Sequence, residues 1–230
     1  MIKLILFDID GTLFDPGKVG RKSITRAFHE VFSIRDAFSG IHMAGKTDIQ
    51  IIKEALAAQG LPSDDGVIPD ILARYVTFLK SEVNTEQMKL KPGVLELLHY
   101  LEKTEEFHLA LLTGNIEQGA RIKLGVFGLN RYFPMDAFGD DHEDRNRLLP
   151  IALERFRKMT TMDIGFRDCI VIGDTPMDVQ CSLPFGAISV VVSTGQYNYE
   201  TLLKTGADYV LKDLSQAKEL KLFYPDFQAV

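Results

Sequence analysis

The chain has 230 residues, of which 46% are hydrophobic and 25% are charged, and its formal net charge is −6. These values are ordinary for a globular protein and allow one large domain or one domain with an insertion. The acidic balance and the absence of a lysine- or arginine-rich block argue against nucleic acid or an anionic membrane as a partner.

The sequence also indicates the cellular compartment. No apolar run approaches the length of a membrane span, and the apolar start, residues 1–7, is too short for a signal sequence. The two cysteines, Cys169 and Cys181, provide no disulfide framework and fit a reducing cytosol. We therefore expect a cytoplasmic protein.

Short aliphatic runs along the chain predict buried strands. These runs are 2–7, 107–112, 169–172, 188–192 and, more weakly, 209–211. Their apolarity is continuous and does not alternate, which indicates strands covered on both faces, as in a parallel sheet. Helical patterns lie between them at 94–101, 116–127 and 148–156. Alternating strands and helices predict a doubly wound α/β fold.

The interval between the first two strands is too long for a single crossover. It spans about 100 residues, whereas a βαβ crossover needs only a few tens. Helical patterns occupy 18–33, 47–59 and 68–83 within it. We therefore predict a helical cap, residues 17–88, inserted into a core formed by residues 1–16 and 89–230. Helical insertions beside an active loop commonly act as lids.

Polar residues follow three of the predicted strands. In an open α/β sheet, ligands bind beyond the carboxyl ends of the strands, where the strand order reverses. The residues at these ends are, in chain order, Asp8, Asp10, Gly11 and Thr12, then Thr113, Gly114 and Asn115, then Gly173, Asp174 and Asp178. Four carboxylates in one crevice require a cation, and oxygen ligands favour Mg²⁺, which usually shares its shell with a substrate phosphate.

The spacing of Asp8 and Asp10 allows the two carboxylates to divide a reaction between them. Residues i and i+2 of a strand face the same side, so both can approach one reacting group. One carboxylate can attack phosphorus and form an aspartyl phosphate. The other can give a proton to the leaving oxygen and later take one from water. The Thr113 hydroxyl and the N–H groups of the helix that starts near Ile116 can bind phosphate oxygens.

Three motifs resemble those of the haloacid dehalogenase superfamily of phosphohydrolases. They are Asp-Ile-Asp-Gly-Thr-Leu at 8–13, Leu-Leu-Thr-Gly-Asn at 111–115 and Ile-Gly-Asp-Thr-Pro-Met-Asp-Val at 172–179. The resemblance covers essentially the whole chain and is closest to the phosphoglycolate phosphatase-like branch. It implies that Asp8 is the nucleophile and Asp10 the acid/base. It also implies that Mg²⁺ is held by the Asp8 carboxylate, the Asp10 main-chain carbonyl and the Asp174 carboxylate, while Asp178 steadies this site from behind.

One element of the family pattern is missing. The family usually has a lysine at the start of the helix that precedes the Asp174 strand, but here no lysine occurs from residue 140 until Lys158. Either Arg145 or Arg147 must supply the positive charge. An arginine can clamp both the nucleophile and the phosphate through its planar fork. We favour Arg145, because it lies closer to the position of the family's lysine.

The remaining predicted contacts concern the substrate. Gly11, Gly114 and Asn115 are expected to line the phosphate site. In the cap, Thr47 or Asp48 is expected to cap a helix. Lys46 has two interpretations: a solvated side chain, or a contact to the distal anionic group of a substrate.

These features favour a Mg²⁺-dependent phosphatase that acts on a small phosphorylated metabolite. A dehalogenase of the same fold would have no use for Asp10 as an acid or for a metal site. A phosphonate hydrolase would need a Schiff-base lysine from the cap, for which Lys46 or Lys53 is available. A phosphosugar mutase would keep the same four aspartates. A non-enzymatic interaction protein is disfavoured, because every catalytic position is filled.

Overall fold

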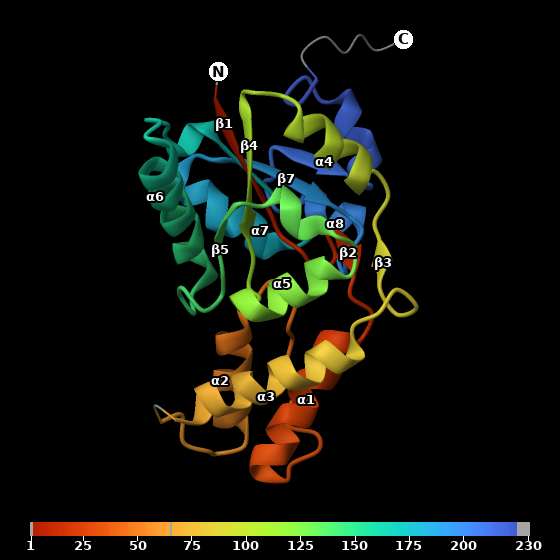
Figure 1. Ribbon diagram of the computed structural model, residues 1–230, viewed down its shortest axis with the longest axis vertical. Coiled ribbons are helices and arrows are strands. Elements are labelled where there is room, and N and C mark those ends of the chain that lie inside the picture. Colours follow the sequence, from red (N-terminus) through yellow and green to blue (C-terminus); the bar gives the residue numbers. More distant parts are fainter. Residues whose placement is uncertain (1, 65, 225–230) are drawn as a thin grey trace.

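A six-stranded sheet forms the centre of the computed structural model, which describes residues 2–64 and 66–224 (Figure 1). Its strand order is β5-β4-β1-β6-β7-β8, and every neighbouring pair is parallel. The strands are β1 (Lys3–Phe7), β4 (Phe107–Leu112), β5 (Met135–Ala137), β6 (Cys169–Gly173), β7 (Ile188–Val192) and β8 (Tyr209–Leu211). The predicted doubly wound α/β fold is confirmed.

Helices cover both faces of the sheet, which explains the continuous apolar runs. Side chains alternate between the faces of a strand, so β1 contributes to two separate hydrophobic clusters. Leu4 packs in the cluster of α6 (Leu148–Thr160), and Ile5 packs on the opposite face in the cluster of α4 (Val94–Glu102) and α5 (Glu117–Gly125). Neither side chain is exposed to solvent. Two shorter helices, α7 (Pro176–Ser182) and α8 (Tyr199–Leu203), follow β6 and β7.

Three helices are inserted between β1 and β4 and form the cap of the fold. They are α1 (Val19–Phe32), α2 (Asp48–Ala58) and α3 (Val67–Glu82). Figure 1 shows them together at one end of the molecule, where α1 packs against α3 and α3 lies next to α5. A short antiparallel ladder of β2 (Phe14–Asp15) and β3 (Lys89–Leu90) joins the segments that enter and leave these helices. The predicted cap limits, residues 17–88, lie just inside this ladder and remain a proposal.

Strand β1 lies at the switch point of the sheet. The chain builds β4 and β5 on one side of β1 and then crosses to β6, β7 and β8 on the other. The loops that follow β1, β4 and β6 are therefore neighbours at one edge. The edge strand β5 was not predicted, because its three residues include an aspartate and are too few to produce an apolar run.

In the part of the chain that the structure describes, no helix is both long enough and apolar enough to cross a membrane.

Candidate active site

Three buried aspartates converge at the carboxyl ends of β1 and β6. Asp8 follows β1, Asp174 follows β6, and Asp178 lies in the first turn of α7. One carboxylate oxygen of each lies within 4.8 Å of those of the other two. Burial raises the pKa of Asp8 to about 6 and that of Asp174 well above its usual range, and the neighbouring carboxylates add to both shifts. A hard cation such as Mg²⁺ suits this all-oxygen set of donors and would relieve their repulsion.

Local backbone features hold Asp174 and Asp178 in place. Gly11 has a φ of +90°, and a Cβ there would lie 2.4 Å from Asp174 Oδ2, so glycine is required for this close approach. The Thr12 hydroxyl on the same loop donates to Asp174 at 3.2 Å. At the start of α7, the main-chain N–H and the hydroxyl of Thr175 donate to Asp178 Oδ2 at 2.9 and 2.7 Å. This capping box leaves Asp178 Oδ1 free to accept a hydrogen bond from Arg145 Nη2.

Arg145 is a buried cation inside this cluster. It begins a single 3-10 turn (Arg145–Arg147) that precedes α6. Its Nη2 lies 2.5 Å from Asp178 Oδ1 and 3.3 Å from Asp8 Oδ1. Among the described residues, its Nε has no hydrogen-bond partner although it is buried. Arg147, the other arginine considered above, is exposed on the surface. The structure therefore brings only Arg145 of the two to Asp8.

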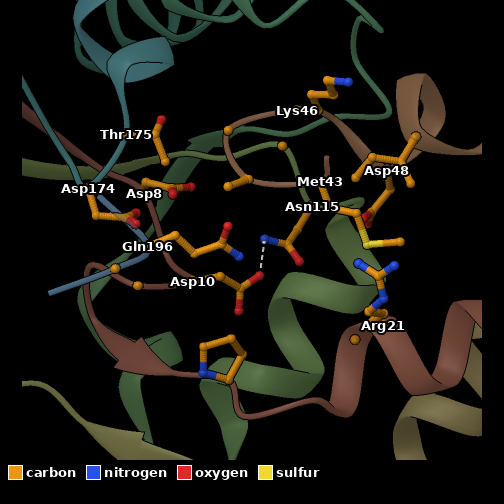
Figure 2. Close-up of a pocket in the computed structure, with 18 of the residues that line it drawn as sticks. Asp8, Asp10, Arg21, Met43, Lys46, Asp48, Asn115, Asp174, Thr175 and Gln196 are labelled. Atoms are coloured by element: carbon orange, nitrogen blue, oxygen red, sulfur yellow. Dashed lines mark hydrogen bonds between the residues drawn. The ribbon is translucent and has the colours of Figure 1, made fainter. Parts of the chain in front are cut away.

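A second polar network surrounds Asp10. The side-chain amide of Asn115 donates to Asp10 Oδ2 at 3.0 Å (Figure 2) and to the Thr113 hydroxyl at 2.9 Å. Lys123 of α5 donates to the same oxygen of Asp10 at 2.5 Å and to Asn115 Oδ1 at 2.6 Å. Thr113 does not cap α5, whose N-cap residue is Ile116. The Thr113 hydroxyl instead accepts from the Asn115 amide and orients it.

The cap contacts the core beside this network. Thr47 is the N-cap residue of α2, and its hydroxyl donates to the Glu143 carbonyl at 2.7 Å. The main-chain N–H of Asp48 donates to the Gly114 carbonyl at 2.8 Å. In return, the Ile116 N–H donates to Asp48 Oδ2 at 2.9 Å. These bonds tie the start of α2 to the loop that follows β4.

Lys46 is held by a neighbouring carboxylate. Its Nζ lies 2.6 Å from Glu54, and its side chain is 18% exposed. Figure 2 shows the ammonium group directed away from Asp8 and Asp10. Lys53, the other cap lysine considered above, pairs with Glu143.

A cavity of about 560 Å³ opens onto both networks and is lined by residues of the cap and of the sheet edge. Its lining includes these predicted residues: Asp8, Asp10, Gly11, Lys46, Gly114, Asn115, Arg145 and Asp174. Thr113 and Asp178 are buried, next to Asn115 and Arg145 respectively. The polar lining residues that the sequence analysis did not assign to the site are Asp15, Lys18, Arg21, His42, Asp48, Tyr75, Lys91, Lys123, Thr175, Thr194 and Gln196.

Among these, Lys123 has a position in the sequence that could have identified it. It falls on the buried side of α5 together with Gly119, Ala120 and Leu124. A lysine on the apolar stripe of a helix needs a partner, because an unpaired buried charge is strongly unfavourable.

The chain belongs to the family of haloacid dehalogenase-like hydrolases, whose model matches residues 5–192. This match confirms the resemblance carried by the three motifs, and with it the predicted class of enzyme, a phosphohydrolase.

Individual relatives fit this class. A phosphoglycolate phosphatase of Vibrio vulnificus is 28% identical over 96% of both chains. The pyrophosphatase PpaX of Halalkalibacterium halodurans is 25% identical over 93% of this chain and 94% of that protein. Among solved structures, CbbY from Rhodobacter sphaeroides in complex with phosphate has a TM-score of 0.71 at 18% identity, covering 94% of this chain and 96% of the other. A hydrolase from Pseudomonas syringae has a TM-score of 0.70 at 22% identity, covering 96% and 99%. Both structural matches support the fold.

Proposed function

We propose that the protein is a Mg²⁺-dependent phosphatase that hydrolyses a small phosphate monoester through an aspartyl-phosphate intermediate on Asp8. One observation carries the proposal: the Asp8 carboxylate belongs to a cluster of three buried aspartates and lies 3.3 Å from the Arg145 guanidinium. A nucleophile in this position can attack a phosphorus atom whose oxygens are neutralised by the arginine on one side and by a cation bound to the aspartates on the other. Relatives named phosphoglycolate phosphatase and pyrophosphatase support the reaction class.

In this proposal, the metal would be held by the Asp8 carboxylate, the Asp10 main-chain carbonyl and the Asp174 carboxylate. Asp178 would steady the site through its bonds to Thr175 and Arg145. Bound Mg²⁺ would supply positive charge that keeps Asp8 ionised and neutralises a phosphate oxygen. The raised pKa values of Asp8 and Asp174 in the protein alone support a site built for a cation.

The reaction proceeds in two steps. In the first, an Asp8 oxygen attacks phosphorus, the bond between phosphorus and the ester oxygen breaks, and Asp10 gives its proton to the departing oxygen. In the second, Asp10 takes a proton from water while the water oxygen attacks the same phosphorus. Inorganic phosphate leaves, and the carboxylate of Asp8 is restored.

The equatorial phosphate oxygens would be bound by groups that already face the cavity. Arg145 offers a guanidinium whose buried Nε has no partner among the described residues. Gly11, Gly114 and Asn115 line the cavity close to the ends of β1 and β4, whereas the Thr113 hydroxyl is buried behind Asn115 and would bind a phosphate oxygen only after this side chain moves.

The cap would select the substrate. Helices α1–α3 enclose one side of the cavity, so a leaving group bound beside Asp10 would contact them. A lid of this kind excludes water and discriminates between substrates by contacting their leaving groups. Lys46 would contact a distal anion of the substrate only after releasing Glu54.

Both cysteines are free and buried, which supports the proposed cytoplasmic location.

The test is a panel of phosphate esters, phosphoglycolate and pyrophosphate included, assayed with Mg²⁺ for released phosphate. Asp8→Asn serves as the inactive control, because an amide cannot attack phosphorus. Hydroxylamine added during turnover should capture the acyl phosphate on Asp8. A rearranged ester without free phosphate would instead indicate a mutase, and halide released from a 2-haloacid would indicate a dehalogenase. Equal phosphate release by Asp8→Asn and the unmodified protein would contradict the proposal.

A further inference from the structure

Lys123 is a buried lysine whose ammonium group is held against Asp10. The residue is 3% exposed, and its Nζ donates hydrogen bonds to Asp10 Oδ2 and Asn115 Oδ1. Helical side chains lean toward the N-terminal end of their helix. Lys123 therefore reaches back along α5 to the loop that follows β4. Burying an ammonium group has a large desolvation penalty, so the pairing with Asp10 is a specific arrangement of this chain.

The two donors to Asp10 meet at one oxygen. Asn115 Nδ2 and Lys123 Nζ both donate to Oδ2, at 3.0 and 2.5 Å. Oδ1 is buried and has no hydrogen-bond partner among the described residues. The last torsion of an aspartate side chain is broad and nearly two-fold, so without such donors the two oxygens would exchange places readily. In this structure Asn115 and Lys123 bind only Oδ2, so the two oxygens of Asp10 differ in their surroundings.

The cap covers the ammonium group of Lys123. A Cβ added to Gly20 of α1 would lie 3.4 Å from Nζ and 3.9 Å from the Tyr75 hydroxyl of α3. The Asp48 carboxylate of α2 lies close enough for its charge to interact with Lys123. Residues from all three cap helices therefore surround a lysine that belongs to the core.

We propose that Lys123 is a positioning residue for the reaction: with Asn115 it fixes the Asp10 carboxyl group through Oδ2, so that this group is held in one orientation while it exchanges the proton. The inference rests on the proposed function, since it assigns a role within the same site. The Asp10 side chain lines the cavity and is 29% exposed, so a carboxyl group fixed in this way faces the space that the leaving oxygen and the water would occupy.

The experiment compares two phosphate esters whose leaving groups differ in their need for a proton from Asp10. The leaving group of phosphoglycolate, or of the best alkyl ester of the panel, is an alkoxide that needs a proton. The leaving group of 4-nitrophenyl phosphate is the 4-nitrophenolate ion, which is stable without one. Steady-state kinetics of Lys123→Met should show kcat/KM reduced about 10²-fold for the alkyl ester, the usual scale of acid–base catalysis, and less than about 5-fold for the aryl ester. Lys123→Arg, which keeps the charge, should recover part of the loss. The matched control is Lys158→Met, whose lysine is 73% exposed and pairs with Glu154 on the surface.

A double-mutant cycle shows whether Lys123 acts through Asp10. In the Asp10→Asn background, adding Lys123→Met should change the residual rate with the alkyl ester by less than 2-fold, about the uncertainty of additivity, where the single variant loses about 10²-fold. Equal losses with both esters, or full additivity with Asp10→Asn, would show that the lysine is only structural. Should thermal unfolding show that Lys123→Met does not fold, Lys123→Gln, which keeps an N–H donor, takes its place in the same cycle. Phosphate release from none of the esters by the unmodified protein would overturn the proposed function itself.

Discussion

Gly114 is the position where a single methyl group should separate the cap from the core. A Cβ there would lie 2.1 Å from the carbonyl oxygen of Lys46 and 2.8 Å from its carbonyl carbon, where ordinary contact begins at 3.4 Å. Both atoms belong to the backbone, so Gly114→Ala would push the start of α2 outward by about 1 Å. The bonds of Asp48 to Gly114 and Ile116 would then lengthen or break.

The magnitude follows from these two bonds. A neutral hydrogen bond contributes about 1 kcal/mol and one to a charged group about 1.5–3 kcal/mol, so closure of the cap should weaken by about 2–4 kcal/mol. At about 1.4 kcal/mol for each tenfold change, kcat/KM for the best ester should fall roughly 30- to 10³-fold. A displacement of this size near a reacting group commonly has an effect on this scale.

The assay is steady-state hydrolysis of that ester, together with thermal unfolding to verify the fold. Gly66→Ala is the matched control, because a Cβ at Gly66 meets open space and its φ of −97° suits any residue. A Gly114→Ala protein with the kcat/KM of the unmodified enzyme would refute the reasoning, since it would show that the contact between α2 and the β4 loop does not limit catalysis.

Three further predictions concern charge. Arg145→Ala should lower kcat about 10²–10³-fold, the scale of one lost transition-state contact, whereas the exposed Arg147→Ala should change kcat little; the reverse order in steady-state kinetics would contradict the assignment. Chelation should abolish phosphate release, Mg²⁺ should restore it, and Ca²⁺, which prefers more ligands, should restore it poorly; full activity after metal removal would disprove the metal site. Asp48→Asn should raise the free energy of unfolding by about 1–2 kcal/mol near pH 7.5 and leave it unchanged near pH 4. Burial raises the folded-state pKa of Asp48 to about 6. Above that pH the ionised carboxylate destabilises the folded state, and this destabilisation disappears as the carboxyl is protonated at lower pH. If denaturant unfolding showed the same increase in the free energy of unfolding of Asp48→Asn at pH 4, this reasoning would be wrong.

Much of the fold could be predicted from local patterns. Strands at 107–112, 188–192 and 209–211 have the predicted limits, and the cap helices begin and end within one residue of theirs. Continuous aliphatic runs identify such strands, because both of their faces are buried. The short edge strand β5 could not be found in this way, because one of its three residues is polar.

The positions of Asp8, Asp10, Asp174 and Asp178 were also predictable, because the carboxyl ends of parallel strands meet at one edge of the sheet. The preference for Arg145 over Arg147 came from the resemblance to the family, because Arg145 lies closer to the position of the family's lysine, and no local pattern decides between them. Two residues separate them in sequence, yet one is buried against Asp8 and the other is exposed. A single 3-10 turn before α6 determines which of the two side chains faces the sheet.

By itself, the sequence of this protein determined which residues end each strand, since the period of the apolar pattern and the small residues after it act over a few positions. Which distant groups meet depends on the packing of the whole chain. Lys123 contacts Asp10 across 113 positions, and Asp48 crosses from the cap to Ile116 across 68. The physical reason is that burial and pairing of a charge depend on how α5 and the cap helices pack over the sheet edge, and no local pattern contains that information.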